Sequence, residues 1–421
     1  MRSSLRAPRP PLRLAALTVT LATGALIPSL NPTTSAADTP TPRSVSPARD
    51  VTGQANGAWT GTWSVSPQSG GSGYKQQTLR QTARTSISGS AVRVRLSNVF
   101  GTKPLVIGNV HIAKRTSGSS VDTATDRVVT FGGRTTVTVP VGETAVSDSA
   151  AFAVGALSDV AVSIYLPEDT GPATYHQQGT QTNYVVSGDA SDDATLPGAA
   201  TTGSYAFLTG LDVQNPAATG AVVALGASIT DGVASAQDSN RRWTNDLAKR
   251  LSDSGRTVGV LNQGISGNRL LADGAGQSAL KRFDRDVLGQ AGVRWVIFSD
   301  DPINDLGNAN PPSAAQLIDG LKQLVSRSHQ AGIRILCSTL TPYEGANYWT
   351  QNGENGRQAV NAFVRSAGSG CDGVVDQDTA THDPARPTRY LPAYDAGDHL
   401  HPNEAGLQAI ANAVNLALLD N

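Results

Sequence analysis

Apolar and polar positions follow two different periods in the two halves of the chain. In the first half they alternate one by one, most clearly at residues 91–96, 135–139 and 160–166. This period is typical of half-buried strands, and the Gly, Asn, Asp and Pro residues between the segments favour tight turns. We therefore predict an antiparallel β-sandwich of the jelly-roll kind over residues 58–213.

Short apolar runs alternate with helical patterns in the second half, from residue 214 to residue 421. Runs typical of buried strands lie at residues 221–224, 257–261, 293–298 and 333–337 and near Val374. Apolar residues at helical spacing lie between or after them: Trp243, Leu247 and Leu251; Leu317, Leu321 and Leu324; Leu407, Ile410, Val414 and Leu418, after a cap at Asn403. Buried strands separated by helices favour a parallel sheet covered on both faces. We predict a three-layer α/β/α fold joined to the sandwich near residues 214–220.

The N-terminus has the pattern of an export signal. Arginines precede an apolar core at residues 14–27, and small residues at 34–36 offer a cleavage site. The apolar core is shorter than the ~20 residues of a membrane-spanning helix, so we expect no stable membrane anchor. We predict a secretory signal peptide over residues 1–37, a flexible Pro-, Ser- and Thr-rich linker over residues 38–57, and a secreted, extracellular protein.

Charge and cysteine content narrow the possible partners. A formal net charge of −1 gives no reason to expect nucleic acid as a partner. Cys337 and Cys371 both fall in predicted strands, and either a disulfide or two separate buried thiols is compatible with the sequence. No residues have metal-ligand spacing. We expect a monomer that needs no metal or cofactor.

Ser228 lies where an open α/β sheet would place a functional group. It follows the first predicted parallel strand directly, and ligands of such sheets bind at the carboxyl ends of the strands. A lone serine there is usually a turn residue or a helix cap, and a nucleophilic serine needs an imidazole within reach. Polar residues that could converge on it lie at 262–270, 299–307 and 395–402.

Together these segments resemble the four sequence blocks of the SGNH (GDSL-type) hydrolase superfamily. The resemblance covers about residues 221–421 and is most specific at 226–232 and 398–403. The β-rich half also resembles the N-terminal domain of secreted actinobacterial esterases of this type. The resemblance implies that Ser228 is the nucleophile, that His401 is the general base and that Asp398 orients His401. It further implies an oxyanion hole made by the N–H groups of Ser228 and Gly267 and the side-chain amide of Asn304.

Two positions depart from the family pattern. Ala227 stands where the family normally has Asp, and Pro302 stands where it normally has Gly. Asp300 and Asp301 add two carboxylates that could tune His401 or bind a polar substrate. The departures motivate an alternative reading, in which the hydrolase fold serves as a binding protein.

We expect several further polar residues to have roles outside catalysis. Only His401 has the three-residue spacing from Asp398, so we expect His399 to be a solvent-facing neighbour. We expect His111 and His176, in the β-rich half, to be structural. We expect Asp231 and Asp305 to brace their own turns, because Asp readily bonds nearby backbone N–H groups.

The resulting prediction is a secreted serine hydrolase that cleaves carboxylic esters through an acyl-enzyme. Its substrate would be an acylated sugar or polysaccharide, or a lipid or small acyl ester. Acyl transfer at the same site is an alternative, as is a β-rich half that acts as a carbohydrate-binding module. Activity should fall as the pH drops through the range in which free imidazole is protonated, near ~6.5.

Overall fold

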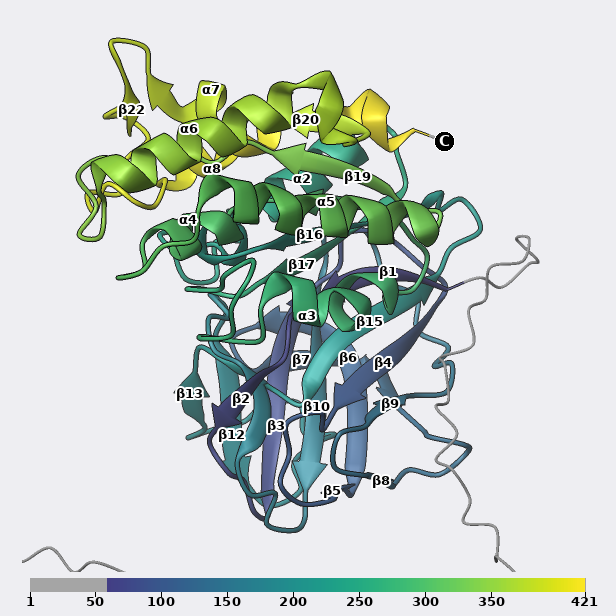
Figure 1. Cartoon of the computed structure of the whole chain (residues 1–421). Coiled ribbons are helices and arrows are strands. Elements are labelled where there is room, and N and C mark those ends of the chain that lie inside the picture. The colour runs from purple at the N-terminus through teal and green to yellow at the C-terminus, as the bar shows by residue number, and fades with distance from the viewer. Residues whose placement is uncertain (1–58, 421) are drawn as a thin grey trace, which may run out of the picture. The chain divides into compact units, whose positions relative to one another are not determined.

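The computed structural model describes residues 59–420 of the 421-residue chain (Figure 1). The predicted signal peptide and linker lie outside the described residues.

Antiparallel strands make up the first half, and between residues 59 and 214 the structure describes no helix. One sheet has the order β1-β15-β4-β9, comprising Trp59–Ser64, Leu208–Gln214, Ala91–Ser97 and Thr144–Val146. A second has the order β13-β12-β3-β10-β6-β7, comprising Ala200–Thr202, Asn183–Ser187, Gln77–Arg84, Asp159–Leu166, Asn109–Ser117 and Ser120–Val128. Smaller sheets are β14-β11-β2 (Tyr205–Ala206, Ala173–His176, Gln68–Gly71) and β5-β8 (Leu105–Ile107, Val137–Val139). The predicted antiparallel β-rich region is confirmed.

A five-stranded parallel sheet organises the second half. Its order is β17-β16-β18-β19-β20, comprising Val258–Gly264, Gly220–Gly226, Val293–Phe298, Arg334–Ser338 and Gly373–Val375. Every residue of β16 is buried, as expected for a strand covered on both faces. A small hairpin of β21 (His382–Asp383) and β22 (Arg386–Tyr390) follows the sheet.

Helices cover this sheet in two groups. One group packs together as α2, α7 and α8, comprising Trp243–Asp253, Gln377–Thr381 and Glu404–Ala413. The other contains α3, α4, α5 and α6, comprising Ala279–Phe283, Asp301–Leu306, Ala314–Gln330 and Gln351–Arg365. In Figure 1, α5 and α6 lie in front of the sheet and α2 lies behind it. The predicted α/β fold is confirmed.

Three details differ from the sequence-based expectations. The last helix ends at Ala413, and Leu418 lies in a separate turn of 3₁₀ helix. Cys371 precedes β20 rather than lying in it, and it forms a disulfide with Cys337 of β19. Helix α6 had no predicted counterpart. Its capping residue Thr350 accepts a hydrogen bond from the backbone N–H of Gly353.

The two halves share a close backbone contact although their sheets differ. Strand β15 ends at Gln214 and β16 begins at Gly220, and all described residues belong to one compact unit. Gly61 of β1 donates its N–H to the carbonyl of Ala291, 2.9 Å away. A Cβ atom placed on Gly259 of β17 would lie 2.0 Å from the carbonyl oxygen of Gly61. Only glycine fits at this crossing.

Within residues 59–420, no helix is long and apolar enough to cross a bilayer. The same residues contain no cluster of three or more His, Cys, Asp or Glu side chains placed to hold a metal ion.

Candidate active site

The backbone turns sharply at Ser228, directly after the buried strand β16. Ser228 is the first residue of the short helix α1 (Ser228–Asp231), and it is 8% exposed. Gly232 ends α1 with φ = 99°, a left-handed conformation that glycine adopts without strain. The turn therefore holds the hydroxyl of Ser228 at the carboxyl edge of the parallel sheet.

The loop before α8 brings an imidazole to this hydroxyl. Nε2 of His401 lies 2.8 Å from Oγ of Ser228, and Nδ1 lies 2.6 Å from Oδ2 of Asp398. The other oxygen of Asp398 accepts the backbone N–H groups of Leu400 and His401. Because a carboxylate facing Nδ1 requires a proton there, the lone pair of Nε2 is directed at Ser228. The structure thus brings the three predicted triad residues together.

Besides Ser228, the residues predicted to form the oxyanion hole lie in segments that follow strands β17 and β18 of the same sheet. Gly267 has φ = 78° and lies in the turn after β17, and Asn304 lies in α4. The side-chain amide of Asn304 donates to the carbonyl of Asn268 at 2.9 Å, and its oxygen accepts the hydroxyl of Tyr348 at 3.3 Å. These contacts fix the rotation of the amide and leave it a second N–H. Among the described residues, the backbone N–H groups of Ser228 and Gly267 have no hydrogen-bond acceptor.

A buried carboxylate holds the serine turn where the family Asp is missing. Asp300 is 2% exposed and accepts the backbone N–H groups of Ala227 and Ile229, at 3.0 and 2.8 Å, and the hydroxyl of Thr230, at 2.7 Å. The expectation that Asp300 tunes His401 or binds substrate is therefore wrong, because its oxygens are used by the turn. The carboxylate that Ala227 lacks is replaced by one from the neighbouring strand end.

Asp301 is also unavailable to a substrate. It is fully buried, and its Oδ1 accepts the side-chain amide of Asn268 at 2.9 Å. Burial raises its pKa to about 6, against the opposing effect of the Arg282 cation. Pro302 follows in the first turn of α4, where a backbone N–H would have no partner within the helix. The second departure from the family therefore fits the helix without loss of a hydrogen bond.

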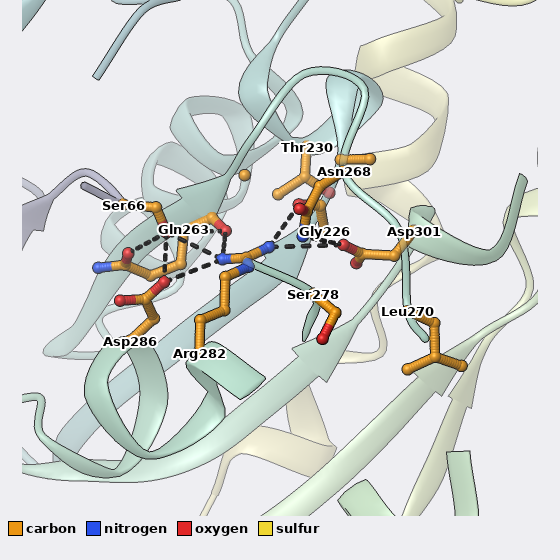
Figure 2. A network of polar contacts seen from close by, with 12 residues as sticks. Ser66, Gly226, Thr230, Gln263, Asn268, Leu270, Ser278, Arg282, Asp286 and Asp301 are labelled. Atoms are coloured by element: carbon orange, nitrogen blue, oxygen red, sulfur yellow. Dashed lines mark hydrogen bonds and ion pairs between the residues drawn. The ribbon is translucent and has the colours of Figure 1, made fainter. Parts of the chain in front are cut away.

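Arg282 of α3 joins the serine turn to the neighbouring loops, as Figure 2 shows. Its guanidinium is fully buried and donates to the carbonyls of Gly226 and Gln263, at 2.9 and 2.6 Å. The same group pairs with Asp286 at 3.2 Å and Asp301 at 3.5 Å. A contact of 2.9 Å to Oγ of Ser66 brings a residue of the β-rich half into this network.

Two aspartates brace the loop that carries Gly267 instead of their own turns. Asp231 of α1 accepts both the backbone N–H and the hydroxyl of Ser266, at 2.9 and 2.7 Å. Asp305 accepts the backbone N–H groups of Leu270 and Leu271, at 2.6 and 3.2 Å. The expectation of local turn bracing is wrong because both carboxylates point across to a neighbouring loop.

Three other histidines have roles predicted from the sequence. His399 is exposed, as expected, and its Nδ1 lies 2.5 Å from Asp395. His111 is buried in the β-rich half and pairs with Asp126 at 2.7 Å. His176 is buried and reaches Asp231 in the other half.

Sequence reasoning missed Arg282 and the bracing role of Asp300. A single arginine in an amphipathic segment is normally expected to be exposed to solvent. Nothing in the spacing of Arg282 predicts that it is completely buried. Asp300 stands 73 positions from Ala227, so only the fold brings them together.

A serine, an imidazole and a carboxylate in this order at a sheet edge are the arrangement that serine hydrolases use. The sequence model of the GDSL-like Lipase/Acylhydrolase family matches residues 224–409. This part of the chain is therefore similar to that family of hydrolases.

Similar solved structures include an acetyl xylan esterase from Geobacillus stearothermophilus, with 22% identity and a TM-score of 0.38, over 48% of this chain and 95% of that one. A lipase/acylhydrolase from Enterococcus faecalis has 19% identity and a TM-score of 0.37, over 46% of this chain and 92% of that one. LAE5, an α/β hydrolase from the metagenome of Lake Arreo, has 25% identity and a TM-score of 0.37, over 48% and 95%. No curated protein matches the sequence.

Proposed function

We propose that this protein is a secreted carboxylic ester hydrolase with Ser228 as nucleophile, His401 as general base and Asp398 as the group that orients the base. The observation that carries the proposal is the pair of contacts made by His401, 2.8 Å to Ser228 and 2.6 Å to Asp398. An alcohol is a weak nucleophile unless a base takes its proton during attack, and this arrangement supplies the base.

The reaction follows from the positions of these groups. Oγ of Ser228 attacks the ester carbonyl while Nε2 of His401 takes its proton. The N–H groups of Ser228 and Gly267 and the amide of Asn304 then stabilise the oxyanion of the tetrahedral intermediate. His401 returns the proton to the departing alcohol, which leaves an acyl-enzyme. Water attacks that ester with His401 again as base, which releases the acid and restores Ser228.

The electrostatics of Asp398 favour its charged form. Burial alone would raise its pKa, but hydrogen bonds from the His401 side chain and from the N–H groups of His401 and Leu400 outweigh burial and keep the pKa below its ordinary value. Asp398 therefore stays ionised at neutral pH and stabilises the imidazolium that forms during attack.

The proposed substrates are acylated sugars or polysaccharides and small acyl or lipid esters. The family supports acyl-ester chemistry in general, and the N-terminal signal pattern supports export. Parallel assays of acetylated xylan, a phospholipid and short-chain p-nitrophenyl esters would assign the class.

The triad is tested by comparing Ser228→Ala with the wild type on p-nitrophenyl acetate and with a fluorophosphonate probe. We expect Ser228→Ala to lose at least about 10⁴-fold in kcat and all labelling. Ser235→Ala is a matched control, because Ser235 is a nearby serine whose hydroxyl bonds only the carbonyl of Gly232. Equal labelling of wild type and Ser228→Ala would refute the assignment of the nucleophile.

The proposed base predicts the pH dependence of the reaction. His401 must be neutral to accept the serine proton, so kcat/KM should fall on the acid side as His401 is protonated. A kcat/KM profile that is flat from about pH 5 to about pH 8 would contradict His401 as base.

A further inference from the structure

His176 is the one histidine of the β-rich half that the structure describes in contact with the hydrolase half. It ends strand β11 and is 3% exposed. Its Nε2 lies 3.0 Å from Oδ1 of Asp231, in the helix that Ser228 begins. Its Nδ1 lies 3.0 Å from the carbonyl oxygen of Ser66.

Only hydrogen-bond acceptors face the two ring nitrogens of His176. Nδ1 faces the carbonyl of Ser66, and Nε2 faces the carbonyl of Gln178 at 3.2 Å as well as the carboxylate of Asp231. A neutral imidazole has one donor, whereas the imidazolium has two. The remaining oxygen of Asp231 accepts two hydrogen bonds from Ser266. The contacts therefore fit a buried imidazolium–carboxylate pair.

Asp231 connects this pair to the oxyanion donors. Its Oδ2 holds the backbone N–H and the hydroxyl of Ser266, the residue directly before Gly267. Helix α1 also packs tightly on the end of β17, since a Cβ atom on Gly264 would lie 2.3 Å from the backbone nitrogen of Asp231. The Asp231 carboxylate therefore ties helix α1, which Ser228 begins, to the loop that carries Gly267.

Other charges near Asp231 do not replace His176. Arg242 is close enough to act on Asp231 through space, but its guanidinium donates to the hydroxyl of Thr180. Arg282 contacts Ser66 and the carbonyl of Gly226 rather than Asp231. Among the described residues, His176 is therefore the basic side chain in hydrogen-bond contact with this carboxylate.

We propose that His176 is a positioning residue of the ester hydrolase: as an imidazolium it fixes Asp231, and through Asp231 it sets the oxyanion loop at Ser266 and Gly267. The β-rich half thus contributes to the transition state without contacting the substrate. This inference rests on the proposed function, because the oxyanion loop matters only if the site hydrolyses esters.

The test compares His176→Gln with the wild type on p-nitrophenyl acetate. Because an oxyanion donor acts mainly in the transition state, we expect kcat to fall about 10-fold and KM to change less than about twofold. The matched control is His111→Gln, since His111 is a buried histidine paired with an aspartate in the same half. We expect that variant to lose stability without losing kcat. An unchanged kcat in His176→Gln, or equal losses in both variants, would overturn the inference.

A double-mutant cycle shows whether His176 acts through the loop. If it does, His176→Gln should cost much less kcat in a Ser266→Ala background than in the wild type. Additive losses would contradict the proposed route. If the wild type turns over no ester in the substrate screen, the proposed function fails instead, which is a distinguishable result.

The protonation state of His176 can be measured directly in the wild type, independently of any rate. Imidazole ¹⁵N chemical shifts of histidine-labelled protein, with the His176 signals assigned from their absence in His176→Gln, should show protons on both nitrogens at pH 7. If His176→Gln does not fold, assignment through His176→Asn serves the same purpose. A neutral tautomer at His176 would overturn the imidazolium.

Discussion

At the scale of single residues, a carboxylate from another strand end restores what the serine turn lacks. Position 227 has no acid group, and Asp300 accepts the turn's hydrogen bonds instead. The sequence identified the missing group but not its replacement. Spacing along the chain carries no information about a contact between two loops of a sheet.

Replacing Asp300 by Ala leaves two buried N–H groups and one hydroxyl without their acceptor. We expect the free energy of unfolding to fall by about 3 kcal/mol or more and kcat by at least about 10-fold. Urea unfolding and kcat measurements check both. Asp212→Ala is the control, because Asp212 is a buried acid that pairs with Arg93 and Arg95 away from the triad. If both variants lose the same kcat, the role of Asp300 is merely structural.

Burial gives the site an unusual dependence of stability on pH. It raises the pKa of Asp305 to about 6, although the N–H groups of Leu270 and Leu271 oppose the shift. Between the ordinary value of 3.8 and about 6 the folded state therefore holds more protons than the unfolded chain. The stabilising contribution of the proton is complete below this window and is lost as the pH rises through it.

We therefore expect the difference in unfolding free energy between the wild type and Asp305→Asn to shift by up to about 3 kcal/mol from pH 4 to pH 6.5, with the wild type losing. Urea titrations at several pH values measure this difference. A constant difference over the whole range would show that Asp305 titrates normally.

At the scale of elements, long periodic segments were predictable and short or glycine-bearing ones were not. Helix α5 follows the spacing of Leu317, Leu321 and Leu324, and Ser313 caps it. Helix α6 has glycines at 353 and 356 in its first turns, which weaken any helical prediction. Both fit close neighbours: a Cβ atom would lie 2.4 Å from the hydroxyl of Tyr343 at the first and 2.6 Å from Leu306 at the second. Tertiary packing, which the sequence does not display, selected these glycines.

The disulfide ties β19 to the segment before β20 across α6. Cys337 and Cys371 are 34 positions apart, and a closed loop of that length stabilises a fold by about 4 kcal/mol in the chain-entropy description. We expect Cys337→Ala/Cys371→Ala to lower the free energy of unfolding, measured by urea titration, by about that amount. Dithiothreitol should lower the midpoint of the wild type and leave that of the double variant unchanged. A wild type insensitive to complete reduction would contradict this.

At the scale of the whole molecule, buried polar contacts join the two halves. Ser66 and His176 reach into the network around the serine turn, and Gln68 donates its side-chain amide to the carbonyl of Ala275 at 2.8 Å. The change of hydrophobic period predicted both folds. It could not predict this interface, because its residues are ordinary Ser, Gln and His in strands and loops.

Because these contacts are buried, residues 214–421 produced alone should leave Arg282 without its contact to Ser66 and Asp231 without its contact to His176. We expect this fragment to unfold without a sharp calorimetric transition and to have less than about a hundredth of the full chain's kcat. A fragment that melts cooperatively and keeps full kcat would contradict this expectation.

The glycine crossing of Gly61 and Gly259 limits how such proteins can be recombined. A chimera that takes its N-terminal half from one relative and its C-terminal half from another keeps the crossing only if both parents have glycine at the equivalent position. If either glycine were replaced, a fusion made in the connection between residues 214 and 220 would join two halves that no longer pack together at this crossing. For this protein, compatibility of the two halves would be decided at Gly61 and Gly259, both far from the cut along the chain.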